Sequence, residues 1–298
     1  MRVAIIGGTG FVGGYLIDAL LRSGHEVVTL VRPGSEDKLH RRDEVGTVQG
    51  DLANREALAA VTKSADAVIY NVGLLREFPS RGVTFEATQF QGVVDTVTAA
   101  RAAGARRLLL MSAIGVKDPG TAYQATKFRA EQHALGSDLD VTVLRPSVIF
   151  GDPRGTMEFA TQLYRDMVRP PLPAIEFAGV QMSPVYCEDV ADAFVAALGD
   201  DTTIGKTIDL AGPEVLTWRE ILVRIAEAVD RQKTILPMPL AMMRAGATLF
   251  DRLPFFPVTR DQLTMLAEGN TGSADELESL IGRTARPLDA QSLDYLAR

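Results

Sequence analysis

Tyr123 and Lys127 are the two residues in this sequence best suited to move a proton. They stand in the stretch YQATK, and a spacing of four residues places two side chains on one face of a helix. Free tyrosine has a pKa of about 10, so acid–base chemistry at neutral pH requires a stabilised phenolate, which a nearby ammonium group provides. Lowering that pKa to about 7 requires roughly 4 kcal/mol. The pair predicts a proton-transfer site, although an aromatic core residue beside a surface lysine has the same spacing.

A glycine-rich stretch at the start of the chain predicts a dinucleotide-binding turn. In MRVAIIGGTGFVGG, Gly7, Gly10 and Gly13 give G-x-x-G-x-x-G, and Gly8 in place of Gly7 gives G-x-G-x-x-G. We expect Gly7 to serve the tight turn, Gly10 the close approach of a pyrophosphate, and Gly13 the packing of helix on sheet. The residues expected to contact the cofactor here are Gly7, Thr9, Gly10, Phe11, Val12 and Gly13.

Arg32 favours NADP over NAD as the dinucleotide. NAD sites usually place Asp or Glu at the end of the second strand, against the ribose hydroxyls, whereas this chain has Arg32 there, in VTLVRPGS. A guanidinium group suits a 2′-phosphate through its charge and its forked hydrogen bonds. NAD stays the alternative because Glu36 and Asp37 follow closely and could bind the ribose.

The elements that must position these groups alternate between strand-like and helix-like segments. Short apolar runs predict parallel strands that are covered on both faces. Between them lie amphipathic segments such as residues 12–20 and 90–97. The pattern predicts an α/β fold with a doubly wound parallel sheet, the Rossmann arrangement. The predicted strands are residues 3–6, 26–31, 47–49, 66–70, 107–111 and 141–144.

The alternation of strand-like and helix-like segments is interrupted after Phe150, which predicts a second, smaller lobe. Three prolines interrupt the chain near residue 170, and residues 182–186 and 207–210 resemble short strands that return to the main sheet. Thr217 with Glu220 has the spacing of a capping box that opens a helix, and Ser273 with Glu276 repeats it. We expect two domains, an NADP-binding Rossmann domain of residues 1–150 and 181–211, and a substrate or partner lobe of residues 151–180 and 212–298.

The segment from Leu236 to Pro257 is apolar around much of a predicted helix. It contains Phe255 and Phe256 between prolines. It can pack within its own lobe, line a substrate cleft or face a protein partner. Attachment to a membrane surface is the least favoured use, because a cationic polar face is absent.

Composition and charge restrict the function further. The chain has 298 residues, with 31 basic and 38 acidic side chains and a net charge of -7, which argues against a broad nucleic-acid surface. Arg101, Arg106 and Arg107 form either a local basic patch or a solvated helix end and strand start. One cysteine and three histidines provide neither a disulfide nor a metal-ligand cluster. Without an apolar run of roughly 20 residues, we expect no integral membrane segment and a cytoplasmic location.

Four motifs in order resemble the short-chain dehydrogenase/reductase superfamily, in its extended and atypical branches. They are GGTGFVG, YQATK, LRPSVIFG and PVYCEDVADA, and the resemblance covers most of residues 1–230. It implies that Tyr123 donates or accepts a proton and that Lys127 also binds the nicotinamide ribose. It further suggests Ser112, in LLLMSAIG, as the hydroxyl that binds the substrate oxygen. Extended members carry their hydroxyl slightly later, where this chain has Ala113 to Gly115, so Ser112 is alternatively a hydrogen bonder at the strand end.

The same resemblance implies further cofactor contacts. Asp51 and Leu52, in QGDLAN, match the pair beside the adenine, although Asp51 alternatively caps the following helix. The turn after the fourth strand and the segment that passes the nicotinamide also match the family pattern. Those residues are Asn71, Val72 and Gly73 in the turn, and Arg145 and Pro146 in the segment.

Within the superfamily, the chain is similar to the NADPH-binding accessory subunit family of respiratory complex I and its bacterial relatives. The resemblance is carried by SAIGV, SPVYCEDVADA, LAGPEVLTWREI and TRDQLTMLAEGN. It leaves two main functions open. One is an NADP(H)-dependent reductase, epimerase or dehydratase acting on a small molecule. The other is a non-catalytic NADPH-binding structural, assembly or redox-sensing subunit with a protein partner on the C-terminal lobe. A transcription-linked cofactor sensor is a weaker third.

Overall fold

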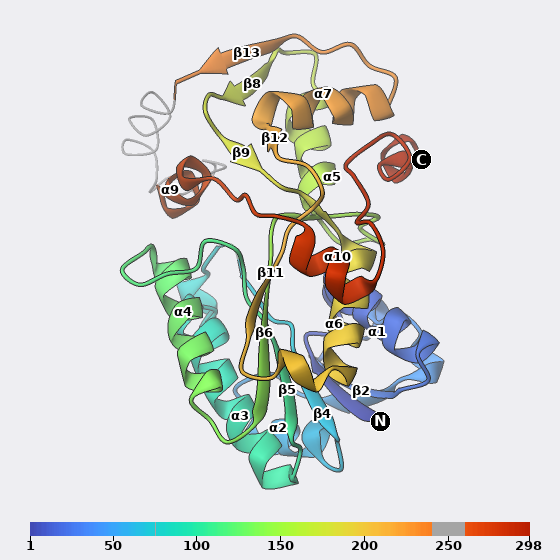
Figure 1. Cartoon of the computed structure of the whole chain (residues 1–298), viewed down its shortest axis with the longest axis vertical. Coiled ribbons are helices and arrows are strands. Elements are labelled where there is room, and N and C mark those ends of the chain that lie inside the picture. The colour runs from blue at the N-terminus through green and yellow to red at the C-terminus, as the bar shows by residue number, and fades with distance from the viewer. Residues whose placement is uncertain (75, 240–259) are drawn as a thin grey trace.

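A seven-stranded parallel sheet forms the centre of the larger lobe (Figure 1). The computed structural model describes residues 1–74, 76–239 and 260–298. The strand order is β11-β6-β5-β4-β1-β2-β3, and every neighbouring pair is parallel. The predicted doubly wound Rossmann fold is therefore confirmed. The strands are β1 (Arg2–Ile6), β2 (Glu26–Val31), β3 (Gly46–Gln49), β4 (Ala67–Tyr70), β5 (Arg107–Met111), β6 (Asp140–Pro146) and β11 (Thr207–Leu210).

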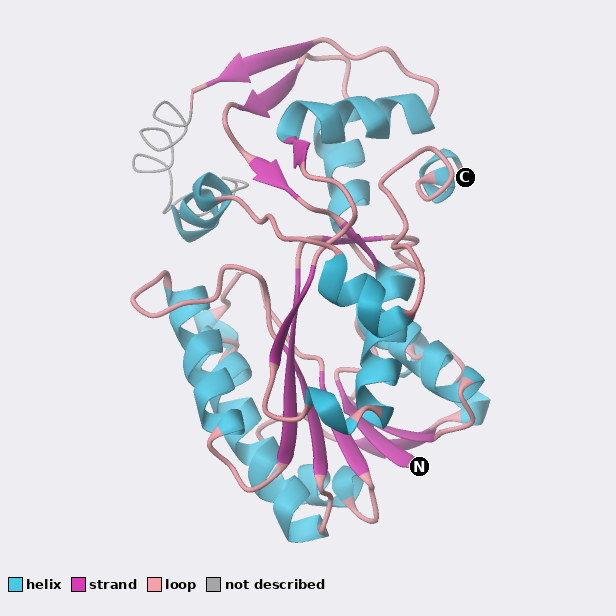
Figure 2. Cartoon of the chain, in the orientation of Figure 1, coloured by secondary structure: helices cyan, strands magenta, loops and turns pink. Residues whose placement is uncertain are grey.

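Helices cover both faces of this sheet (Figure 2). Alternate strand residues supply their packing partners. Val3 and Ile5 pack on one face of the sheet, whereas Ala4 and Ile6 pack on the other. Burial on both faces explains why β1 reads as a continuous apolar run. The helices of the first face are α1 (Phe11–Arg22), α6 (Cys187–Gly199) and α10 (Asp275–Ile281). Those of the second are α2 (Arg55–Thr62), α3 (Gly92–Ala103), which follows the π-helical turn η4 (Glu86–Gln91), and α4 (Ala122–Leu135).

The smaller lobe has its own core around Trp218, whose ring contacts Phe159 and Phe177. Three two-stranded sheets build it or join it to the larger lobe: β10–β7, β12–β9 and β13–β8. Its elements are β7 (Ile149–Phe150), α5 (Phe159–Leu163), η5 (Tyr164–Val168), β8 (Ala174–Phe177), β9 (Gln181–Met182), β10 (Val185–Tyr186), β12 (Leu216–Thr217), α7 (Trp218–Ala228), β13 (Ile235–Met238), α9 (Arg260–Glu268) and η7 (Asp294–Ala297). Short helical turns elsewhere are η1 (Glu36–Lys38), η2 (Arg42–Glu44), η3 (Pro79–Arg81) and η6 (Asp201–Thr203).

Two local predictions for the second half differ from the structure. Residues 207–210 join the main sheet as β11, but residues 182–186 do not, because β9 pairs with β12 and β10 pairs with β7. The capping box of Thr217 and Glu220 is confirmed. The one predicted for Ser273 and Glu276 is wrong, because the Glu276 carboxylate accepts a hydrogen bond from the Asp209 backbone and α10 begins without a side-chain cap.

The division into two domains stays a prediction. Helix α10 packs on the larger lobe, although the predicted division places it in the smaller one. Leu277 and Ala285 lie in the hydrophobic cluster of α1 and α6, whereas the sequence predicts that residues 212–298 belong to the smaller lobe. Most of the apolar segment from Leu236 to Pro257, including Phe255 and Phe256, lies outside the described residues.

Arg107 corrects the interpretation of the basic residues at the start of β5. Arg101 and Arg106 are exposed, but Arg107 is buried and donates hydrogen bonds to Asp140, Thr142, Ala197 and Thr203. It therefore belongs neither to a surface patch nor to a solvated strand start.

Among the described residues, no helix has both the length and the apolar character needed to cross a bilayer. In the same part of the chain, no group of three or more His, Cys, Asp or Glu residues could hold a metal ion.

Candidate functional site

The glycine turn joins β1 to α1, and the structure itself requires glycine at positions 7 and 13 but not at position 10. Gly7 has a φ of 105°, which favours glycine. A Cβ on Gly13 would lie 2.3 Å from the Gly7 carbonyl oxygen, so this position must be glycine for α1 to pack here. A Cβ on Gly10 would meet only that same oxygen, at 3.4 Å. Gly10 therefore leaves open space beside the start of α1.

The start of α1 is suited to an anion. Gly10 is the N-cap and offers no side chain to the helix, and the first N–H groups of a helix lack partners within it. These N–H groups and the helix dipole attract phosphate. Thr9, Phe11 and Val12 belong to this turn, with Val12 buried and the other two partly exposed.

Gly8 is a glycine whose role the sequence did not reveal. A Cβ there would lie 2.4 Å from the Thr29 hydroxyl oxygen on β2. Thr29 is buried and donates to the Ile5 carbonyl. Gly8 is thus required for packing between neighbouring strands, and both glycine frames read from the sequence have a physical basis.

The turn after β4 lies directly against the glycine turn. Asn71 donates from its backbone to the Ile6 carbonyl and from its side chain to the Gly7 carbonyl, at 2.8 and 3.4 Å. Val72 lines a small cavity beside Lys127. A Cβ on Gly73 would lie 3.9 Å from Lys127 Nζ. The structure therefore brings this turn between the glycines and the lysine.

Arg32 and Asp51 lie at the carboxyl ends of β2 and β3. Arg32 is exposed, and no ion pair of its guanidinium with another described residue is present. Asp51 accepts a hydrogen bond from the backbone N–H of Ala53, while Asn54 caps α2. Asp51 is therefore not the helix cap, and Leu52 beside it packs against the core.

Tyr123 and Lys127 are held by the first turns of α4. A capping box of Thr121 and Gln124 starts this helix. Lys127 is buried, donates to the Met111 carbonyl at 3.2 Å, and has its Nζ 5.7 Å from the centre of the Tyr123 ring. The ring of Phe85 packs edge-on against Tyr123.

Burial sets the protonation of this pair. It lowers the pKa of Lys127 to about 8, although the charge of Glu131 opposes the shift. Burial also raises the pKa of Tyr123 above its ordinary value. In the chain without a bound cofactor, desolvation of the phenolate opposes the proton transfer predicted for Tyr123, and that role stays a prediction.

Ser112 follows β5 and faces the same small cavity as Lys127. Its hydroxyl is buried without a hydrogen-bond partner among the described residues, while its backbone N–H donates to the Leu144 carbonyl. A buried hydroxyl without a partner carries an energetic penalty that a bound polar group removes. The side chain thus does not act as a strand-end hydrogen bonder. The cavity, of about 10 Å³, is lined by Tyr70, Val72, Gln89, Val93, Leu110, Met111, Ser112, Lys127 and Ala130.

Gln89 is a site residue that sequence reasoning missed. It lies in the π-helical turn η4, is buried, donates to the Leu74 carbonyl and accepts from the Thr126 hydroxyl. Its sequence context, FEATQFQG, contains several polar residues and does not distinguish Gln89 from its neighbours. Pro146, at the end of β6, is buried and its carbonyl accepts from the Ile114 backbone.

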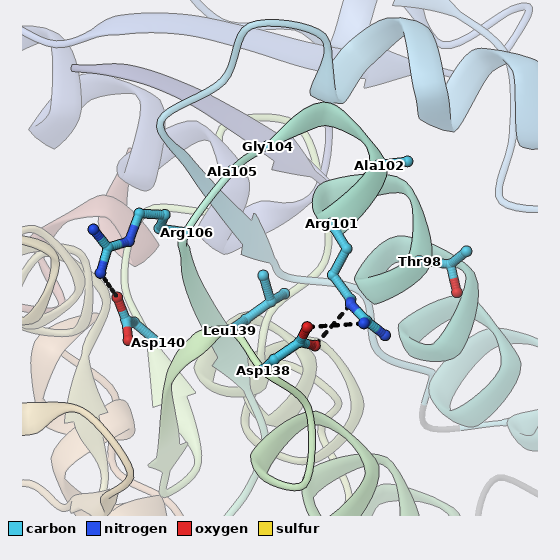
Figure 3. A pocket seen from close by; sticks show the side chains of 9 residues that line it. All are labelled: Thr98, Arg101, Ala102, Gly104, Ala105, Arg106, Asp138, Leu139 and Asp140. Carbon is cyan, nitrogen blue, oxygen red and sulfur yellow. Dashed lines mark hydrogen bonds and ion pairs between the residues drawn. The ribbon is translucent and has the colours of Figure 1, made fainter.

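A further hollow lies at the other end of the sheet. It has a volume of about 520 Å³ and contains the ion pairs Arg101–Asp138 and Arg106–Asp140 (Figure 3). These residues precede β5 and β6, whereas ligands of parallel α/β sheets bind beyond the carboxyl ends of the strands. The hollow is therefore separate from the glycine turn.

The fold and this site define a dinucleotide-binding protein. The open space at Gly10 and the free first turn of α1 fit the phosphates of such a cofactor. The chain belongs to the NAD(P)H-binding family, whose model matches residues 7–201.

The known proteins that the chain resembles include both a subunit of a complex and an enzyme. The chain is 29% identical over 289 residues to the mitochondrial NADH dehydrogenase [ubiquinone] 1 alpha subcomplex subunit 9 of Arabidopsis thaliana, covering 92% of this chain and 70% of the relative. It is 29% identical over 249 residues to the ceramide reductase of Caulobacter vibrioides, covering 82% and 76%. The crystal structure of gox2253 has the same fold, with a TM-score of 0.80, 21% identity and coverage of 99% and 96%.

Proposed function

We propose that this protein is an NADP(H)-dependent reductase, epimerase or dehydratase that acts on a small molecule. The observation that carries the proposal is the cavity beside α4, where the Lys127 ammonium and the unpartnered Ser112 hydroxyl face the same space. The centre of the Tyr123 ring lies 5.7 Å from Lys127 Nζ. A merely structural helix gives no reason to bury an ammonium group at this place.

The roles follow from these positions. The dinucleotide supplies or accepts a hydride when it is bound. Tyr123 transfers a proton to or from the substrate oxygen. Burial raises its pKa in the chain alone, so a bound group such as the positive nicotinamide ring of the oxidised cofactor must help Lys127 to stabilise the phenolate. Ser112 holds that oxygen through its free hydroxyl, and Lys127 binds the ribose next to the nicotinamide. Asn71, Val72 and Gly73 support the dinucleotide from behind, together with Asp51, Leu52 and Pro146.

The preference for NADP rests on Arg32. Its exposed guanidinium follows β2 and has no ion-pair partner among the described residues, so it can receive the 2′-phosphate without losing another contact. Arg32→Ala should weaken NADPH binding about tenfold or more in calorimetric titration and leave NADH binding unchanged, since a charge-assisted contact contributes about 1.5–3 kcal/mol. Arg42→Ala, in the same loop, is the matched control. An unchanged NADP(H) preference in Arg32→Ala would exclude Arg32 as the phosphate-binding residue.

The first experiment is to identify the dinucleotide that co-purifies with the protein by mass spectrometry. Reoxidation of that dinucleotide is then measured with carbonyl compounds, sugar nucleotides and ceramide-type substrates, the last because one relative is named ceramide reductase. Turnover that disappears in Tyr123→Phe supports the enzyme. A bound dinucleotide without turnover on any substrate contradicts it.

A second candidate is a non-catalytic NADPH-binding subunit of a larger complex. It is favoured by the Arabidopsis relative, which aligns with 92% of this chain and is named as a subunit of NADH dehydrogenase. Isolation of the native protein under mild conditions distinguishes the two candidates. Stable association with other chains, unaffected by Tyr123→Phe, supports the subunit.

A further inference from the structure

The short segment that follows α9 connects the smaller lobe to both sides of the candidate site. Asn270 is its centre. The Asn270 side chain donates to the Ile114 carbonyl at 3.2 Å and accepts from the Val148 backbone at 3.0 Å and from the Ser147 hydroxyl. Its backbone also pairs with Gln181 and Ser183, near β9. One asparagine therefore joins the loop after β5, the end of β6 and the smaller lobe.

Glu268, two residues earlier, holds the beginning of α4. One carboxylate oxygen accepts from Gln124 Nε2 and the other pairs with Lys117 Nζ, both at 2.7 Å. Gln124 is buried, also donates to the Gly115 carbonyl, and is the neighbour of Tyr123. The exposed ion pair with Lys117 contributes little by itself, whereas the bond to a buried amide fixes geometry.

The groups held in this way include the predicted proton donor and the loop beside the free hydroxyl. Tyr123 is the second residue of α4, in the first turn of the helix, where the backbone N–H groups have no partner within the helix. The position of its phenol depends on the capping box and on what holds Gln124. Ser112 begins the loop that contains Ile114 and Gly115. The smaller lobe thus reaches both walls of the site through residues 268–270.

We propose that Asn270 and Glu268 are positioning residues that hold the first turn of α4 and the loop after Ser112 in the geometry needed for proton transfer. This inference rests on the proposed enzymatic function. Neither residue needs to touch substrate or cofactor. Each acts through Tyr123 or Ser112.

The test uses substitutions that break single contacts. Asn270→Asp keeps the oxygen that accepts from Val148 and Ser147 but replaces the donor to Ile114 with an acceptor. Glu268→Ala removes both contacts of the carboxylate, while Lys117→Met removes only the ion pair and is its matched control. Glu268→Gln retains an acceptor for Gln124 and should restore wild-type behaviour. Asn270→Ala is the second variant at that position, and equilibrium unfolding verifies that each protein folds.

Hydrogen exchange of the full-length protein is the readout that does not depend on turnover. We expect exchange in residues 113–117 to rise about tenfold in Asn270→Asp, and in residues 122–125 by a similar factor in Glu268→Ala. Exchange in α7 and NADPH affinity should stay within about threefold of wild type. With a substrate identified, kcat should fall about tenfold or more while KM stays within about threefold, because misplacement of a proton donor affects the chemical step.

The possible outcomes separate this inference from the proposed function. Unchanged exchange in folded Asn270→Asp and Glu268→Ala overturns the inference, whether or not the protein is an enzyme. Faster exchange with unchanged kcat also overturns it, since the contacts would then be structural only. A lack of NADPH binding in the wild-type protein refutes the proposed function, whereas loss of turnover in Lys117→Met equal to that in Glu268→Ala refutes the role assigned to the Gln124 contact.

Discussion

At the scale of single residues, different glycines of the turn are needed for cofactor binding and for folding. The Cβ direction of Gly10 is open and its φ of -83° suits any residue, whereas a Cβ on Gly13 would collide with backbone atoms of Gly7 and Gly8. We therefore expect Gly10→Val to fold and to lose dinucleotide binding, and Gly13→Ala to lose stability. Calorimetric titration and urea unfolding measure the two effects. Retained affinity in a folded Gly10→Val variant would show that the phosphates do not approach this turn.

The buried Lys127 makes stability depend on pH in an unusual direction. Burial lowers its pKa from 10.5 to about 8, so below pH 8 the folded protein carries a charge that is more stable in the unfolded chain. Between pH 8 and about 10.5 the unfolded state binds more protons, and stability rises with pH, by up to roughly 3 kcal/mol.

Replacement of this lysine by an uncharged residue tests the predicted direction in which stability changes with pH. Lys127→Met should increase the free energy of unfolding of the dinucleotide-free protein by about 2 kcal/mol at pH 7, and the gain should disappear near pH 10.5. The loss of the hydrogen bond to the Met111 carbonyl reduces the gain. Urea unfolding at both pH values measures it, with the exposed Lys117→Met as control. An equal effect at both pH values would contradict the low pKa.

At the scale of elements, Arg107 joins parts of the structure that are distant in sequence. Its guanidinium donates to groups on β6, at the end of α6 and in η6. Arg107→Met should lower the free energy of unfolding by about 3 kcal/mol, since several buried acceptors lose their donor. Arg106→Ala should change stability little, because its side chain is 86% exposed. Equal losses in the two variants would contradict this assignment.

The strands of the main sheet could be predicted because their signal is local. A strand buried on both faces must be apolar along its length, and β1, β2 and β5 each read as such a run. The short strands β9 and β10 have no such signal, and their partners are chosen by tertiary packing. Arg107 shows the same limit, because nothing local indicates that α6 and η6 will enclose it.

In the candidate site, too, the features set by a short motif could be predicted, whereas those set by tertiary contacts could not. The glycine turn and the pair of Tyr123 and Lys127 are short motifs whose geometry follows from one turn or one helix. The contacts of Asn270 join segments more than a hundred residues apart, and no spacing rule connects them. The direction of the Tyr123 pKa shift likewise depends on desolvation by the whole fold.

At the scale of the whole molecule, the C-terminal tail connects the two hydrophobic cores. After α10, which packs on α6, the chain returns to the smaller lobe, where Leu293 and Leu296 join the Trp218 cluster. Between these points the tail is fixed by Asp189 of α6, which is fully buried. One Asp189 oxygen pairs with the Arg283 guanidinium at 2.6 Å, and the other accepts from the Arg286 backbone at 2.7 Å.

Loss of the Arg283 contact should therefore weaken the attachment of the tail to the larger lobe. Arg283→Ala leaves the buried Asp189 carboxylate without its cation, which should lower the free energy of unfolding by about 3 kcal/mol and speed proteolysis within residues 283–298. Asp192→Asn alters the other partner of the same guanidinium, at 2.6 Å and partly exposed, and is the matched control with little expected change. Urea unfolding and limited proteolysis measure both effects. Similar behaviour of the two variants would mean that burial of Asp189 does not stabilise the tail, and that its apolar contacts with the Trp218 cluster hold it alone.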